Sequence, residues 1–306
     1  MILKPRTVST ELRFLRHLSR RSMLAEKDVL NYSNKEKGLE GERRFDKCLE
    51  SLSNETLILH DLLLEHGSHQ FFQIDTLMIL QRVIYHFEVK NYQGVHYIEK
   101  DKWYRENGVE LTNPIHQMKR CATLLNKFLQ PLHIPLPIKS YVIFIHPEIT
   151  LFQAPRHLPI ILPTQLKAFL KKLNSEAFSS KPIFTSKHEK LANYLLTKHM
   201  EDFPYTRVPE YDYDQLQKGI PCCGCSAFLS FFNKGKLVCR SCGYTEAAES
   251  GVLRSVEEYK FLFPDRKMTV NSLFEWCGKV VSPNIIRRVL QQNFKLISKG
   301  RSSYYV

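Results

Sequence analysis

The sequence predicts an α/β domain that is followed by two small units. Between residues 38 and 198 helix-like and strand-like patterns alternate, which is typical of one sheet with helices before and after it. Residues 201–214, "EDFPYTRVPEYDYD", carry two prolines, five acidic residues and no apolar periodicity, so they are predicted to be a linker. Two pairs of closely spaced cysteines follow, which indicates a small unit stabilised by metal.

Residues 1–35 form a basic leader. Leu12, Leu15 and Leu18 recur at near-helical spacing, so we expect a helix that packs on the domain behind it. Its arginines are expected on the other faces of that helix: Arg13, Arg16, Arg20 and Arg21.

The α/β domain is expected to span residues 36–200. Its predicted elements follow in this order: a helix at 41–52, strands at 57–64 and within 71–90, a helix at 113–129, strands at 140–147 and 158–163, and helices from Thr164 and about Ser186. After the linker, assigned to residues 201–216, the two small units are expected at 217–251 and 264–306.

The composition restricts the class of protein. The chain has 306 residues, of which 43% are hydrophobic, so it can bury a sizeable core. Its net charge of +13 favours polyanionic partners such as nucleic acid, although a merely basic surface is an alternative. No apolar run approaches the roughly 20 residues of a membrane span, and the leader lacks a signal-peptide core. We therefore expect no membrane partner. Eight cysteines are too few for a disulfide scaffold, which favours a reducing compartment and predicts a cytoplasmic protein.

The stretch "FQIDTLMILQRVIYHFEVKN" places three charges within two apolar strands. If Gln81 and Arg82 form a two-residue turn, Asp75 lies directly opposite Glu88, and Lys90 shares their face. Opposed residues have Cβ atoms about 5 Å apart, where two carboxylates repel and one resists ionisation.

A divalent cation would remove this conflict, and hard oxygen ligands suit Mg²⁺ or Mn²⁺. Lys90 could then orient the attacking water or balance charge on a phosphate oxygen. The alternative is a buried ion pair of Lys90 with one acid, with the other acid at a solvated strand end. The triplet Glu88, Val89, Lys90 does not decide between them.

Two more side chains are candidates for the same site. In "KGLEGERRFDKCL", Gly38 and Gly41 are expected to precede a helix whose early Glu42 supplies a third carboxylate, or merely complements the helix dipole. In "NPIHQMKR", Asn113 and Pro114 mark a helix start, and Gln117 in the first turn could hydrogen-bond substrate or water.

As an ordered set, "GLEGE", "FQIDTLMIL", "FEVKNYQG", a following Trp103 and "NPIHQ" resemble the nuclease-related domain (NERD), a branch of the restriction-endonuclease-like superfamily. The resemblance extends over about residues 1–200, because "ILKPRT" is also similar to members of this group. It implies a mixed sheet flanked by helices, with Asp75 and Glu88 as metal ligands, Lys90 as catalytic lysine, and Glu42 and Gln117 at auxiliary positions. The hairpin turn lacks the glycine of many members.

The cysteine unit has zinc-ribbon spacing. Cys222 and Cys225 form one C-x-x-C pair and Cys239 and Cys242 the other, with an apolar hairpin between them that turns at residues 233–235. Four thiolates complete a closed tetrahedral Zn²⁺ site, which would be structural. Cys223 is an extra thiol between ligands, and a disulfide pair or four free thiols is the alternative.

The tail resembles a small winged helix, with a helix, a short break, a second helix and a hairpin. Ser282 is a candidate N-cap before Pro283, and the buried stripe of the second helix is predicted from its spacing: Ile286, Val289 and Leu290. The expected nucleic-acid contacts come from the polar face of that helix and the hairpin tip: Arg287, Arg288, Gln291, Lys299 and Arg301. A basic helical cap on the ribbon is the alternative.

Together these features predict a metal-dependent nuclease that acts on DNA, with Mg²⁺ or Mn²⁺ held by Asp75, Glu88 and the Val89 carbonyl, and with carboxyl-terminal modules that hold nucleic acid. Two other functions stay open. The protein could bind nucleic acid with an idle nuclease site, or its zinc ribbon could dock another polypeptide. The retained acids and Lys90 favour the nuclease, while the two basic units favour nucleic acid as partner.

Overall fold

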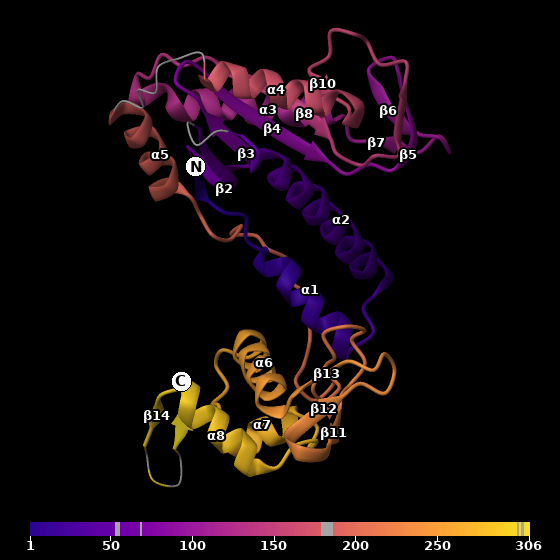
Figure 1. Ribbon diagram of the computed structural model, residues 1–306, viewed down its shortest axis with the longest axis vertical. Coiled ribbons are helices and arrows are strands. Elements are labelled where there is room, and N and C mark those ends of the chain that lie inside the picture. Colours follow the sequence, from indigo (N-terminus) through magenta and orange to yellow (C-terminus); the bar gives the residue numbers. More distant parts are fainter. Residues whose placement is uncertain (53–55, 68, 179–185, 299, 301–302) are drawn as a thin grey trace. The chain divides into compact units, whose positions relative to one another are not determined.

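The computed structural model describes the chain except for residues 53–55, 68, 179–185, 299 and 301–302. Its contacts divide the chain into two compact units, whose helices and strands are labelled in Figure 1. The first unit contains residues 1–10 and 33–206, and the second contains residues 11–32 and 207–306. No helix in the described part of the chain is long and apolar enough to cross a membrane.

The leader is divided between the units, which differs from the boundaries expected from sequence. Strand β1 (Ile2–Lys4) joins the sheet of the first unit, whereas helix α1 (Thr10–Arg21) belongs to the second. The spacing of the leucines predicted the buried stripe of α1, and Leu18 lies in the core of the second unit. Arg21, expected on another face, is fully buried instead. Periodicity identifies a stripe but not the core against which it packs.

A mixed six-stranded sheet forms the centre of the first unit, and the expected α/β class is confirmed. The strands lie in the order β1, β2 (Leu57–His66), β3 (Gln70–Ile79), β4 (Ile84–Lys90), β8 (Ile138–Phe144) and β10 (Ile160–Ile161). β3 pairs with β4 antiparallel, and β4 pairs with β8 parallel. The site described below lies on these central strands.

Helices cover both faces of this sheet (Figure 1). They are α2 (Glu26–Leu49), α3 (Pro114–Leu129), α4 (Pro163–Phe178) and α5 (Ser186–Lys198), with a short 3-10 turn η1 (Gln130–Leu132) after α3. Leu125 of α3 and Leu195 of α5 pack in one core with Leu77, while Phe45 of α2 and Leu173 of α4 pack on the other face. The result is a three-layer arrangement.

Helix α2 begins well before the position predicted from sequence. Gly38 and Gly41 lie inside the helix rather than before it, so Glu42 is in its middle and not at its amino terminus. Gly41 is required by a close approach, because an added Cβ would lie 2.5 Å from the Cβ of Asn91. The Asn91 side chain donates to the Lys37 carbonyl at 2.8 Å, which fixes α2 against the end of β4.

A second sheet in the first unit was not predicted. Its order is β7 (Glu110–Leu111), β6 (Lys102–Arg105), β5 (Gly94–Glu99) and β9 (Ile149–Phe152). Trp103 of β6 is buried and stacks on Phe144 of β8 with ring centroids 5.8 Å apart. These strands are only two to six residues long, so alternation of apolar residues gives little sign of them.

The second unit contains the cysteine ribbon and the tail in one core. The ribbon strands are β11 (Ser230–Phe232), β12 (Lys236–Val238) and β13 (Thr245–Ala247), and the predicted turn between the first two is the 3-10 turn η2 (Asn233–Gly235). Helix α6 (Ala248–Leu262) follows, mostly within the stretch left unassigned between the two small units. Its Val252 shares a core with Leu237 of the ribbon and Trp276 of the tail.

The tail has the expected order of elements: α7 (Val270–Trp276), α8 (Pro283–Asn293), β14 (Leu296–Ile297) and β15 (Tyr304–Tyr305). Pro283 occupies the first turn of α8 as predicted. Ser282 is the N-cap residue by position, although its side chain makes no capping hydrogen bond. The buried residues of α8 are the predicted stripe: Ile286, Val289 and Leu290.

Candidate active site and metal centre

The hairpin of β3 and β4 has the register that its sequence predicts. The backbone N–H of Leu80 donates to the Val83 carbonyl at 2.9 Å across the two-residue turn. The ladder continues in register to the pair of Thr76 and Phe87. There the two strands separate, and the next residue on β3 is Asp75.

Where the backbone pairing of β3 and β4 ends, the Asp75 side chain replaces a backbone acceptor. One carboxylate oxygen accepts from the backbone N–H of Val89 at 2.8 Å. On the neighbouring strand Asp61 has a left-handed φ of 55°, and its carboxylate accepts from Gln73 at 2.5 Å. The alternation of buried side chains shifts by one residue at this point, as one core shows on β2: Leu57, Leu59, Leu62 and Leu64. Such irregularities re-aim side chains near functional sites.

Glu88 and Lys90 of β4 lie together with Gln117 of α3. The Lys90 ammonium is 2.8 Å from a Glu88 oxygen and donates to the Gln117 side chain at 3.0 Å. Asn113 caps α3 by accepting from the Ile115 N–H, which sets the first turn that carries Gln117. The ion pair of Lys90 with one acid is therefore present. Asp75 does not lie at a solvated strand end, because its carboxylate is bonded to the backbone of β4.

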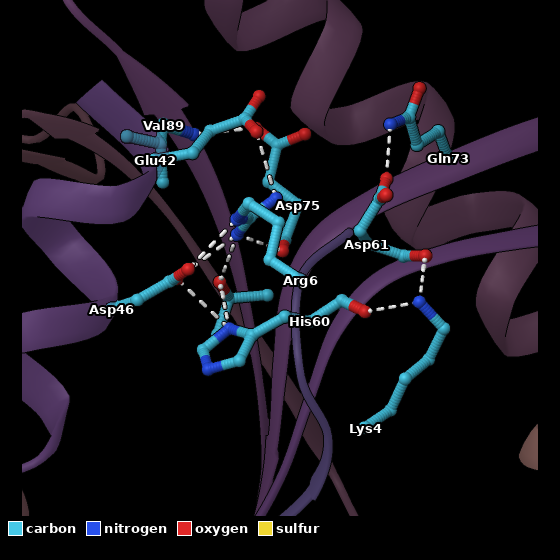
Figure 2. A network of polar contacts seen from close by, with 10 residues as sticks. Lys4, Arg6, Glu42, Asp46, His60, Asp61, Gln73, Asp75 and Val89 are labelled. Carbon is cyan, nitrogen blue, oxygen red and sulfur yellow. Dashed lines mark hydrogen bonds and ion pairs between the residues drawn. The ribbon is translucent and has the colours of Figure 1, made fainter. Parts of the chain in front are cut away.

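Glu42 reaches the same region from α2, as Figure 2 shows beside Asp75 and Val89. Arg6, which follows β1, donates to Glu42 at 2.8 Å and to the Asp75 carbonyl at 2.7 Å. Arg6 also forms two hydrogen bonds with the Asp46 carboxylate, at 2.8 and 3.1 Å. The structure thus brings all five predicted catalytic residues into one region, and adds an arginine between them.

Burial and mutual repulsion shift the protonation of these acids. Burial, and then the charge of Asp75, raise the pKa of Glu42 to about 7 although Arg6 opposes this. The same two causes raise the pKa of Glu88 to about 7 against the influence of Lys90. Burial also raises the pKa of Asp75. For Lys90 burial acts to lower the pKa, but Glu88 and Asp75 outweigh it and raise the pKa.

This donor set fits a hard divalent cation in its chemistry. Carboxylates with raised pKa values are short of positive charge, which a cation would supply. Among the described residues, however, the four cysteines of the ribbon are the one set of three or more His, Cys, Asp or Glu side chains whose ligand atoms all converge. The acids of the hairpin are therefore near one another without forming a closed cage.

The cysteine cluster has the geometry of a tetrathiolate zinc site. The four ligand atoms of Cys222, Cys225, Cys239 and Cys242 lie within 4.8 Å of one another. The sulfur atoms of Cys222 and Cys242 are 3.7 Å apart, and those of Cys225 and Cys239 are 3.4 Å apart. Tetrahedral Zn–S bonds place sulfur atoms about 3.8 Å apart, so these distances fit Zn²⁺.

The residues predicted to contact nucleic acid are only partly described. Arg287, Arg288 and Gln291 are exposed on α8, as expected for its polar face. Arg287 donates to the Asn284 side chain at 3.0 Å, and Arg288 forms an ion pair with Glu249. Lys299 and Arg301 lie outside the described residues.

Several polar residues of the first unit were not identified from sequence. Asp46 is one helical turn after Glu42, a spacing that could have indicated a shared face. His60 and Asp61 interrupt the apolar run of β2, and this interruption was a usable sign. Arg6 lies in the stretch "ILKPRT", whose similarity to the family marked the segment but gave no role to its arginine.

Comparisons with known proteins identify one family over part of the chain. Over 53% of its length the chain is similar to the crystal structure of protein VC1899 from Vibrio cholerae, at 10% identity and a TM-score of 0.28. It spans 38% of that protein, and the likeness is too low to support an argument. No curated protein matches the sequence. The family model of the nuclease-related domain matches residues 37–145, which include Glu42, Asp75, Glu88, Lys90 and Gln117. The chain therefore contains a nuclease-related domain, NERD, followed by a four-cysteine cluster that fits a zinc ribbon.

Proposed function

We propose that the first unit hydrolyses phosphodiester bonds of DNA with Mg²⁺ or Mn²⁺, and that the second unit binds nucleic acid. The observation that carries the proposal is the gathering of Asp75, Glu88 and Lys90 where β3 and β4 separate, within the nuclease-related domain. Two buried acids beside a lysine suit the hydrolysis of a phosphodiester.

Asp75, Glu88 and the Val89 carbonyl would hold the cation. The N–H and C=O of one residue in a strand point to the same side, so the Val89 carbonyl points to the side where its N–H meets Asp75. When bound, the cation would polarise the phosphate and lower the pKa of water.

Lys90 would act as a cation rather than as a base. Its raised pKa keeps the ammonium protonated at neutral pH, so it can donate to phosphate oxygens and stabilise the negative charge that develops on them. Gln117 accepts one of its hydrogens and so orients the ammonium. Glu42, with a pKa of about 7, is suited to accept a proton from the attacking water.

The second unit offers aromatic and basic groups for nucleic acid. Phe231 is 47% exposed and Phe232 is 57% exposed on the ribbon, and Lys236 lies opposite Phe232 in the ladder. The acid of the neighbouring strand, Glu246, is paired with Arg254. Aromatic rings beside cations suit the bases and phosphates of a single strand.

Cleavage assays test the enzyme. Plasmid, linear and single-stranded DNA, and RNA, are incubated with Mg²⁺, Mn²⁺ or no added metal. We expect metal-dependent cleavage of DNA that falls about 100- to 1000-fold in Asp75→Asn and Lys90→Met, because each removes charge stabilisation at the reacting phosphate. Nucleic-acid affinity should change less than about twofold, since phosphate contacts elsewhere carry it. Lys102→Met, at an exposed ion pair with Glu110, is the control.

One observation favours a second candidate. The Lys90 ammonium lies 2.8 Å from Glu88 and gives this acid a partner in the absence of a cation, which suits a nucleic-acid-binding protein with an idle nuclease site. Wild-type protein that binds DNA but cleaves none of the substrates would support this function. Absence of both binding and cleavage would instead favour a ribbon that docks another protein.

A further inference from the structure

Arg6 lies outside the matched family region, in a segment fixed to the central sheet. Strand β1 pairs in parallel with β2, with Ile2 opposite Ile58 and Lys4 opposite Leu59. The Lys4 ammonium donates to the carbonyls of His60 and Asp61 at 3.0 and 2.9 Å. These contacts hold the chain beside the irregular part of β2 just before Arg6 turns inward.

The guanidinium of Arg6 joins residues from different elements. Its side chain is 3% exposed. It donates to Glu42 of α2 and to the backbone carbonyl of Asp75 on β3, while the Asp75 carboxylate is held separately by the Val89 N–H. Asp75 is therefore fixed at its backbone by Arg6 and at its side chain by β4. Figure 2 shows Arg6 between Glu42, Asp75 and Asp46.

A second layer holds Arg6 itself. Asp46 accepts from both Nε and Nη2 of Arg6, and one Asp46 oxygen is also 3.0 Å from Nδ1 of His60. That nitrogen is 3.1 Å from the Thr76 hydroxyl, next to Asp75 in the chain. A planar guanidinium can satisfy these directions at once, whereas a lysine ammonium offers a single point of charge.

We propose that Arg6 is a positioning residue of the proposed nuclease site, which fixes Glu42 and Asp75 relative to each other. The amino-terminal segment is then a functional part of the nuclease-related unit. The role rests on the proposed function, since Arg6 acts through two residues assigned to the reaction. The nearest other explanation is that Arg6 only stabilises the fold.

The test compares Arg6→Met and Arg6→Lys with the control Arg44→Met, which removes an exposed arginine of α2 that pairs with Glu40. Mn²⁺ affinity of protein that retains its zinc is measured by electron paramagnetic resonance, beside kcat, KM and thermal unfolding. We expect Mn²⁺ affinity to fall about 10- to 100-fold, as when outer partners of metal ligands are removed. We expect kcat to fall about 100-fold from misplacement of the acids, with KM unchanged. Arg6→Lys should not restore either value.

Addition of methylguanidinium to Arg6→Ala should recover part of the Mn²⁺ affinity and of kcat. Folded Arg6→Met and Arg6→Lys with wild-type Mn²⁺ affinity and kcat would overturn the proposal. Variants that unfold, and that methylguanidinium does not restore, would overturn it in favour of a purely structural role. If the wild type shows no metal-dependent cleavage, the nuclease assignment fails, and the Mn²⁺ measurements still test whether Arg6 organises the acids.

Discussion

Each unit buries one arginine from the first 21 residues of the chain, and the charges around the two arginines differ. In the second unit Arg21 is fully buried, donates to both oxygens of Glu258, and lies 3.8 Å over the ring of Trp276. Its remaining hydrogen bonds go to two backbone carbonyls. In the first unit Arg6 has both Glu42 and Asp46 as acidic partners, with Asp75 close by.

The pKa values of Glu258 and Glu42 shift in opposite directions. Burial would raise the pKa of Glu258, but hydrogen bonds from Arg21 and His17 lower it to about 2. Burial and Asp75 raise the pKa of Glu42 to about 7, and Arg6 only reduces this rise. A buried ion pair thus stabilises a unit when positive charge is sufficient. The acids around Arg6 outnumber the positive charges, which lowers stability at neutral pH and favours binding of a cation. This excess of acids distinguishes the candidate active site from the structural ion pair of Arg21 and Glu258.

The largest expected effect on stability comes from the four-cysteine cluster of the second unit. Cys239→Ser should lose the single zinc and unfold residues near 220–245, because a structural zinc supplies about 10 kcal/mol or more of folding free energy. Zinc content and limited proteolysis measure this. Cys223→Ser, at an exposed thiol outside the cluster, should keep its zinc. Freshly purified, reduced wild-type protein without zinc would refute the assignment.

The next effect is the acid sensitivity of Glu258. Its pKa lies below the ordinary value of 4.5, so its stabilisation is complete above about pH 4.5 and is lost as the pH falls towards 2. The loss should reach about 3 kcal/mol. Trp276 fluorescence in a Trp103→Phe background reports unfolding of the second unit. Acid also releases zinc from the cysteines of both proteins, so the two are compared at each pH. The stability difference between wild type and Glu258→Gln should shrink as the pH falls, and a constant difference would contradict the shift.

In the first unit, the stability that depends on Glu42 should change with pH in the opposite direction. The pKa of Glu42 is raised from 4.5 to about 7, so in Mg²⁺-free and Mn²⁺-free buffer its ionisation lowers stability as the pH rises between these values. Glu42→Gln should therefore be more stable than wild type at pH 8, by about 3 kcal/mol, and equal to it at pH 4. Trp103 fluorescence in a Trp276→Phe background measures this. A variant that is less stable at pH 8 would remove the contrast between the units.

The smallest effect is expected on α8. Arg287→Ala and Arg288→Ala should each reduce the salt dependence of DNA binding by a slope of roughly 0.9, if each side chain contacts a phosphate. Arg288 already has Glu249 as partner, so we expect Arg287 to contribute more. Binding isotherms at several salt concentrations decide this. Unchanged affinity and slope in the double variant would make α8 a structural cap or a protein-docking surface.

Those parts of the two sites that depend on local spacing could be predicted from the sequence. The two C-x-x-C pairs, the register of the β3–β4 hairpin and the first turn of α3 were all correct, because each is fixed within a short stretch. The position of Glu42 within its helix was wrong. The reason lies in a distant residue, since Gly41 is explained by its contact with Asn91 and not by a helix start.

Features that depend on contacts distant in sequence could not be predicted. The network around Arg6 joins residues up to 70 positions apart, and no periodicity encodes such a distance. The small sheet of β5, β6, β7 and β9 was missed because its order within the fold joins segments on both sides of α3. Helix α6 was not predicted either, although its buried apolar residues, among them Val252, Val256 and Tyr259, have helical spacing.

The division of the leader between the units has a practical consequence. The chain passes from the first unit to the second near residue 10, returns near residue 33, and passes over again near residue 206. A fragment of residues 1–206 would therefore carry α1 without its own core, with the stripe of Leu12, Leu15 and Leu18 left bare. The complementary fragment would lack Arg21 and leave Glu258 without its arginine. Protein fragments that are divided at the linker should therefore aggregate. The nuclease-related unit is better isolated as residues 1–206 with residues 11–32 replaced by a short flexible loop.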